Sequence, residues 1–87
     1  MRESVIERTV TAYAKKQGWL TCKIQGQHNR GFPDRLFFRD RVLICVEFKA
    51  TGRKPTQLQA HVHQKLINSG FSVHVIDSIE NGKQLLA

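Results

Sequence analysis

Two segments rich in apolar residues, joined by a very short connection, are the feature that most constrains how this 87-residue chain can fold. Residues 36–38 and 42–48 are rich in β-branched and aromatic side chains, which favour strands. Between them, Asp40-Arg41 is the shortest plausible turn, with Arg39 and Val42 on either side of it. We therefore predict an antiparallel hairpin, with its second strand buried on both faces because residues 42–46 are all apolar.

The register of this hairpin brings acidic side chains together. If Arg39 pairs with Val42 across the turn, counting outward places Asp34 opposite Glu47. Paired residues share one face of the sheet, and Lys49 points to that same face. Two opposed carboxylates repel unless a cation lies between them, and Mg²⁺ is commonly held by one or two carboxylates and water. The pattern favours a divalent-metal site, although a solvated strand end would also explain Glu47 and Lys49.

Gly31-Phe32-Pro33-Asp34 followed by Glu47-Phe48-Lys49 resembles the PD-(D/E)XK nuclease signature. With an N-terminal helix that bears Glu7, the chain is similar over essentially its whole length to the VRR-Nuc (virus-type replication-repair nuclease) family, of the stand-alone viral type. The resemblance implies one nuclease domain over residues 1–87 with a restriction-endonuclease-like α/β core.

The hydrophobic periodicity predicts the element order α-β-β-β-α-β with a closing helix, a mixed sheet flanked by helices. A Thr56-x-x-Gln59 capping box begins the second long helix, and Gly70 ends it. The other expected elements are a helix over residues 2–17 with an apolar stripe of Ile6, Val10, Tyr13 and Ala14, a strand over 19–25, a loop over 26–33, a strand over 71–76 and a helix over 79–86. The strands on either side of the second helix should be parallel.

The resemblance also implies the roles of individual side chains. The catalytic residues would be Asp34, Glu47, Lys49 and a glutamine early in the second helix. Gln57 and Gln59 compete for that glutamine, and helical periodicity turns Gln59 more toward the apolar side. The expected metal ligands are Glu7, Asp34, Glu47 and the backbone carbonyl of Phe48, with Mg²⁺ as the metal and Mn²⁺ as a substitute.

Other residues receive simpler interpretations. The same helix should bury Leu58, Val62 and Leu66. His61 and His63 lie about 200° apart around it and are both predicted to be surface residues. The two cysteines, Cys22 and Cys45, are expected to be small buried hydrophobes in a reducing compartment.

The net charge of the chain predicts the kind of molecule that it binds. The formal net charge is +7 and the pI about 10.0, which is typical of a nucleic-acid-binding protein. Lys23, Arg30, Arg53 and Lys54 are the expected contacts to DNA phosphates. No long apolar run suggests a membrane segment, and the absence of an apolar signal segment favours the cytoplasm, that of a host cell if the chain is viral.

We therefore predict a Mg²⁺-dependent, structure-selective DNA endonuclease, a homodimer that resolves four-way (Holliday) junctions. The rival prediction is a non-catalytic nucleic-acid-binding domain with the same fold, but acids near a phosphate weaken binding unless a metal intervenes. A general or flap-type nuclease is a further alternative, whereas the chain is too small to carry base-reading elements of a restriction enzyme. Val5 is only a weak candidate for the dimer interface.

Overall fold

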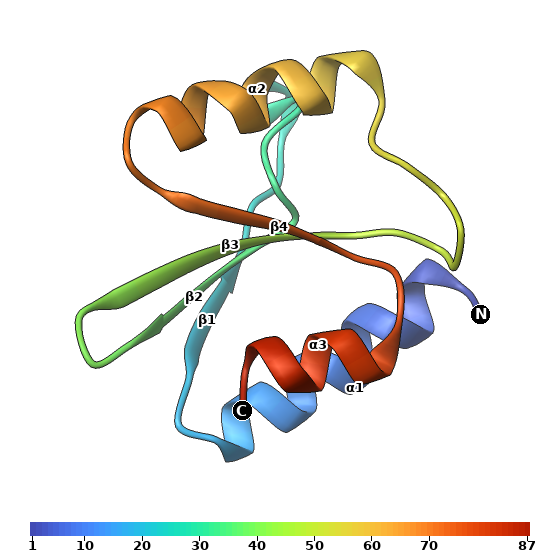
Figure 1. The fold of residues 1–87 in the computed structure, drawn as a ribbon, viewed down its shortest axis with the longest axis vertical. Coiled ribbons are helices and arrows are strands. Elements are labelled where there is room, and N and C mark those ends of the chain that lie inside the picture. Colours follow the sequence, from blue (N-terminus) through green and yellow to red (C-terminus); the bar gives the residue numbers. More distant parts are fainter.

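A four-stranded mixed sheet with the strand order β1-β2-β3-β4 forms the centre of the molecule in a computed structural model that describes residues 1–87 (Figure 1). The elements are α1 (Glu3–Lys16), β1 (Leu20–Lys23), a short 3-10 turn (Gln27–Asn29), β2 (Arg35–Arg39), β3 (Val42–Phe48), α2 (Gln57–Asn68), β4 (Ser72–Ile76) and α3 (Ile79–Leu85). The predicted fold class and element order are confirmed. Only the ends of the elements differ from the expected bounds.

The hairpin of β2 and β3 has the predicted two-residue turn. Asp40 and Arg41 both have positive φ angles, 51° and 69°, which is the type I′ geometry that matches the twist of the flanking strands. Arg39 pairs with Val42, and the ladder continues to Arg35 and Val46. The next pair outward is Asp34 and Glu47, as the register predicts.

Alternation along β3 separates the two faces of the sheet. Ile44, Val46 and Phe48 enter the core on the face covered by α1 and α3, while Cys45 and Glu47 point to the face of α2. Figure 1 shows α2 on one side of the sheet and the other two helices together on the opposite side. All five residues are buried, so this end of β3 is buried on both faces as expected, whereas Val42 at the turn end is exposed and Leu43 is half-buried because the helices do not cover that end of the hairpin.

The crossover through α2 makes β4 parallel to β3, as predicted, and α3 returns the chain to α1. The indole N–H of Trp19 donates to the carbonyl of Leu86 over 3.0 Å, and the guanidinium of Arg39 lies 4.2 Å from the Trp19 ring centroid. These contacts fasten the C-terminal end of α3 beside the start of β1. No helix is long and apolar enough to span a membrane.

Two residues that were expected to be buried are exposed. Cys22 is exposed, because β1 is an edge strand and Cys22 points to the side of the sheet that α2 leaves open there; Cys45 is buried as expected. Leu58 is 44% exposed, because α2 is rotated so that other residues face the sheet.

Gly82 sets the closest approach of α3 to α1. A Cβ at this position would lie 2.8 Å from Cγ1 of Val10 and nearer still to Cγ2. We predict that Gly82→Ala lowers the free energy of unfolding by about 1–3 kcal/mol, because overpacking outweighs the gain in helix propensity. Urea denaturation measures the change, and Gln84→Ala, at an exposed position of the same helix, is the control. An increase in stability for Gly82→Ala would show that the helices can separate without cost.

Candidate active site

The loop before β2 is held against α2, and Gly31 makes this contact possible. Its φ is +83°, and a Cβ there would lie 2.8 Å from Cγ2 of Val62 and 3.0 Å from Cγ of Leu58. No larger residue fits without moving the helix. Pro33, two residues on, is fully buried. The Gly-x-Pro sequence thus delivers Asp34 to the sheet at a fixed distance from α2.

Asp34 is joined to the last residue of β3. The backbone N–H of Phe48 donates to Oδ2 of Asp34 over 2.7 Å, so the carboxylate continues the hairpin ladder beyond its last backbone pair. Burial raises the pKa of Asp34, and the negative charge of Glu7 adds to this effect, although the bond from Phe48 opposes it.

Glu47 lies beside Asp34 and is almost completely buried, with 1% of its surface exposed. Its Oε2 atom contacts Nζ of Lys49 at 3.4 Å and accepts a hydrogen bond from Nε2 of Gln59 over 3.2 Å. Its Oε1 atom has no hydrogen-bond partner. Burial, together with the charge of Asp34, raises the pKa of Glu47 to about 7. This pair of carboxylates therefore needs positive charge nearby.

The capping box at the start of α2 orients Gln59. The side-chain carbonyl of Gln59 accepts a hydrogen bond from the backbone N–H of Thr56 over 2.9 Å, and the backbone N–H of Gln59 donates to the Thr56 hydroxyl. The amide nitrogen is then left to face Glu47. Gln57 is exposed, so Gln59 is the glutamine that the structure brings to the acids.

Glu7 has different partners. Its Oε2 atom binds Nζ of Lys23 at 3.0 Å and Nε of Arg35 at 2.8 Å, on the α1 side of the sheet. Burial alone would raise the pKa of Glu7, but the bonds from Lys23 and Arg35 outweigh it and lower the pKa. Of the three acids expected as metal ligands, the structure brings two together, and no three Asp, Glu, His or Cys side chains gather closely enough to hold a metal ion.

Two carboxylates still fit the expected metal. Mg²⁺ keeps several waters and commonly takes only one or two protein carboxylates. The buried, unpartnered Oε1 atom of Glu47 is the observation that supports the fit, because such an atom is costly unless a cation, proton or water satisfies it.

His63 was predicted to be a surface residue, and this is wrong: 5% of it is exposed. Its Nε2 atom lies 3.8 Å from Oε1 of Glu47, and neither atom has a hydrogen-bond partner. Burial lowers the pKa of His63, so the imidazole is neutral near pH 7 and the contact is not an ion pair. The sequence did contain a signal, since His63 follows Gln59 by four residues and must share its side of the helix.

The predicted DNA-binding residues differ in whether they already have a partner in the chain. Lys23 is engaged by Glu7, whereas Arg30, Arg53 and Lys54 are exposed and their side chains form no ion pair within the chain. Arg35 was not predicted, because a charged residue at the start of a strand resembles an ordinary surface position.

The raised pKa of Glu47 makes stability depend on pH. The pKa of the Glu47 carboxyl is 4.5 in the unfolded chain and about 7 in the folded chain without metal. Between these two pH values only the folded state keeps the proton on Glu47, so the free energy of unfolding should fall as pH rises through this range. We predict that Glu47→Gln abolishes this fall and is more stable than the natural chain at pH 8 by roughly 3 kcal/mol, with little difference at pH 4. Urea denaturation in EDTA measures it. Glu80→Gln, at an exposed position, should behave like the natural chain; parallel pH profiles for all three proteins would contradict the burial of a charged Glu47.

Comparisons with known proteins agree with this fold. No protein-family model matches the chain. It is 38% identical over 79 residues to "Putative nuclease p44" of Acyrthosiphon pisum secondary endosymbiont phage 1, which covers 90% of this chain and 85% of that protein. A solved structure described as "VRR_NUC domain" superimposes with a TM-score of 0.85 at 26% identity, over 95% of this chain and 91% of the other.

A second solved structure, described as "VRR_NUC domain protein", has a TM-score of 0.82 over 98% of this chain and 84% of its own, and at 16% identity it shows the shared fold alone. The phage relative is similar along nearly the whole of both chains, and the first solved structure shares both fold and sequence with this one. The chain therefore belongs to the VRR-Nuc family of nucleases.

Proposed function

We propose that this nuclease is a Mg²⁺-dependent endodeoxyribonuclease that hydrolyses phosphodiester bonds, with Mn²⁺ able to replace Mg²⁺. The observation that carries the proposal is the convergence of Asp34, Glu47, Lys49 and Gln59 at one end of the hairpin. Two carboxylates, one cation and one amide donor meet where β3 ends. The phage relative supports action in the cytoplasm of a host cell.

Asp34 and Glu47 would hold the metal, with the backbone carbonyl of Phe48 as a further ligand. A bound divalent ion supplies an activated water near neutral pH and stabilises negative charge on the phosphate under attack. We place Glu7 outside this set, because its carboxylate is already bound by Lys23 and Arg35. Its role is to hold those two cations in position.

Lys49 and Gln59 act around the carboxylates. The Lys49 side chain is 13% exposed, so its ammonium group can reach substrate while it remains beside Glu47. There it stabilises charge that develops on the phosphate oxygens. Gln59 fixes the orientation of Glu47 by donating to Oε2, and the unpartnered Oε1 would be available to hold the metal.

A non-catalytic DNA-binding domain explains these residues less well. Buried acids repel phosphates, so a protein that only binds DNA gains nothing from Asp34 and Glu47 side by side. Basic charge alone is compatible with both functions. The acid pair is the feature that favours the enzyme.

We predict that Glu47→Gln lowers the rate of DNA cleavage in Mg²⁺ by about a thousandfold or more, because metal coordination contributes several kcal/mol of charge stabilisation. DNA affinity should stay within about threefold of that of the natural chain, because the substitution removes no positively charged group that could bind a phosphate. The assay uses linear duplex, flap and four-way junction DNA, each with Mg²⁺ and with EDTA. Glu80→Gln is the charge-matched control. Full activity of Glu47→Gln, or undiminished cleavage in EDTA, would exclude the proposed site.

We further propose a two-fold symmetric homodimer that resolves four-way junctions by paired nicks. One site per chain cuts one strand, so resolution needs two sites related by symmetry. An apolar row supports a dimer: Leu20 and Phe38 are exposed and Leu43 is half-buried, and the three are neighbours across three strands, on the face that α2 leaves open at the turn end of the hairpin. In Figure 1 this end of the hairpin extends past the helices. The row is a better interface candidate than Val5, which is half-buried.

The dimer proposal predicts that Leu20→Glu gives a monomer that still nicks DNA but no longer makes paired cuts, because Leu20 is 71% exposed and lies outside the core. Light scattering measures the mass, and a cruciform plasmid separates one cut from two. Met1→Glu, another exposed apolar position, is the control and should remain dimeric. If the natural chain is a monomer that cuts duplex and junction equally, it is a general or flap-type nuclease instead.

A further inference from the structure

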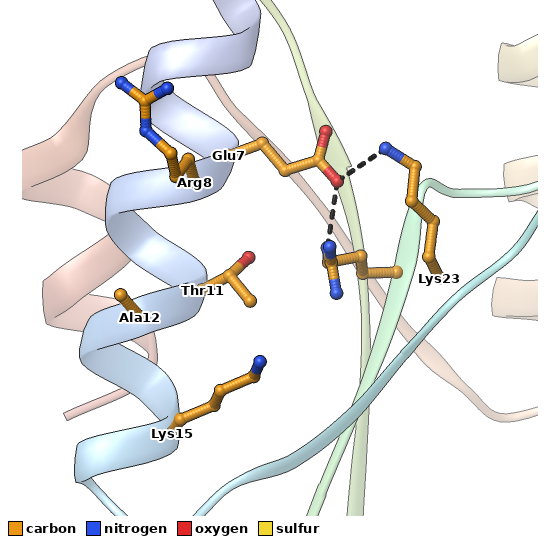
Figure 2. A pocket seen from close by; sticks show the side chains of 7 residues that line it. Glu7, Arg8, Thr11, Ala12, Lys15 and Lys23 are labelled. Carbon is orange, nitrogen blue, oxygen red and sulfur yellow. Dashed lines mark hydrogen bonds and ion pairs between the residues drawn. The ribbon is translucent and has the colours of Figure 1, made fainter.

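A pocket of about 410 Å³ lies on the face of the sheet opposite Glu47, between α1 and the ends of β1 and β2 (Figure 2). We call it the basic pocket; the residues that matter to it are Glu7, Thr11, Lys15, Lys23 and Arg35, with Arg8 at its rim. The acid pair on the other face is not part of it. Arg35 nevertheless directly follows Asp34 in the chain, so the pocket adjoins the active site through one peptide bond.

Positive charge dominates the basic pocket. Lys15, Lys23 and Arg35 face one carboxylate, Glu7, and a single oxygen of that carboxylate accepts from both Lys23 and Arg35. Arg35 donates to Glu7 through Nε alone, and both terminal nitrogens of its guanidinium group have no partner in the chain. The Lys15 side chain forms no hydrogen bond or ion pair within the chain, and Figure 2 shows its ammonium group directed into the pocket. The acid therefore positions two cations and leaves donors free.

Thr11 provides the independent evidence for a ligand. The residue is 5% exposed, and its hydroxyl oxygen has no hydrogen-bond partner. Figure 2 shows that oxygen pointing into the pocket between Glu7 and Lys15. Buried hydroxyl groups in folded proteins are nearly always satisfied, so an unpartnered one among cations indicates an acceptor that binds there. The acceptor must be an anion with several oxygens, because the free donors on Lys15, Arg35 and Thr11 come from different directions.

We propose that the basic pocket binds a phosphate group of the nucleic-acid backbone, one that flanks the phosphate being cleaved. Phosphate offers several strong acceptor oxygens, and guanidinium groups bind it in a fork geometry. The proposal rests on the nuclease function proposed above, because that function supplies the nucleic acid. Holding a neighbouring phosphate on the α1 side would fix the strand while Asp34 and Glu47 face the bond that breaks.

The test measures DNA binding in EDTA, where cleavage cannot interfere, with three variants. Thr11→Val removes the hydroxyl without changing charge or shape, and we expect an affinity loss of about tenfold. Lys15→Ala should lower the slope of log K against log salt by about one, the effect of one lost phosphate contact. Lys16→Ala is the matched control: it removes the same charge from the last turn of α1, is exposed and does not line the basic pocket. Its slope should equal that of the natural chain.

Stability separates a ligand role for Thr11 from a structural one. Thr11→Val should keep or increase the free energy of unfolding in urea, because it removes an unsatisfied buried hydroxyl. Lower affinity with undiminished stability supports the phosphate site. Unchanged affinity for Thr11→Val, or equal slopes for the two lysine variants, overturns it.

Two further experiments identify the molecule that supplies the phosphate group. Titration of inorganic phosphate into the natural chain and into Thr11→Val tests whether the pocket binds a free anion. If phosphate binding depends on Thr11 while all variants have equal DNA affinity, the pocket is a small-anion site and the proposal fails. A duplex with single methylphosphonate substitutions locates the contact, which should be one position near the cut and should lose its effect in Lys15→Ala. If Thr11 and Lys15 support binding but no DNA is cleaved in Mg²⁺, the pocket stands and the proposed function fails.

Discussion

The hydrogen bond from the Phe48 amide to Asp34 is the interaction on which the site depends. It extends the pairing of β2 and β3 by one step past the last backbone pair, and it uses a side chain to do so. Because the Phe48 side chain is completely buried under α1 and α3, the donor cannot move without disturbing the core. Asp34 is therefore fixed relative to Glu47 by the fold itself, and the repulsion between the two carboxylates cannot be relieved by moving them apart.

Two glutamates on opposite sides of the sheet, Glu47 of β3 and Glu7 of α1, are in opposite electrostatic states. Glu47 is buried beside another acid and has a raised pKa, whereas Glu7 is bound by Lys23 and Arg35 and has a lowered one. Neither state can be deduced from the residue type. The face with excess negative charge suits a cation, and the face with excess positive charge suits an anion. A nucleic-acid strand with its accompanying metal ion presents both.

The sequence predicted those features of the fold and the site that depend on residues close together in the chain. A two-residue turn leaves only one register, so the pairing of Asp34 with Glu47 followed from counting. The Thr56 and Gln59 capping box is equally local. The partners of Glu7 and the burial of His63 depend on how α1 and α2 are rotated against the sheet, which is a property of packing between distant segments. The expected stripe of α2 contains only apolar residues, of which Leu58 is exposed, whereas the side of α2 that faces the sheet also carries Gln59 and His63, which contact Glu47.

The docking of α1 against α3 has a consequence for how the molecule opens. The hairpin joins residues close in sequence, so closing it costs little chain entropy, whereas the contact of Gly82 with Val10 closes a loop of almost the whole chain. Long closures of this kind form late in folding and are the first to be lost in local unfolding. Amide hydrogens of α3 should therefore exchange with solvent sooner than those of β3. Transient release of α3 would uncover the Val10 side of α1, whereas the hairpin that places Asp34 beside Glu47 would stay closed.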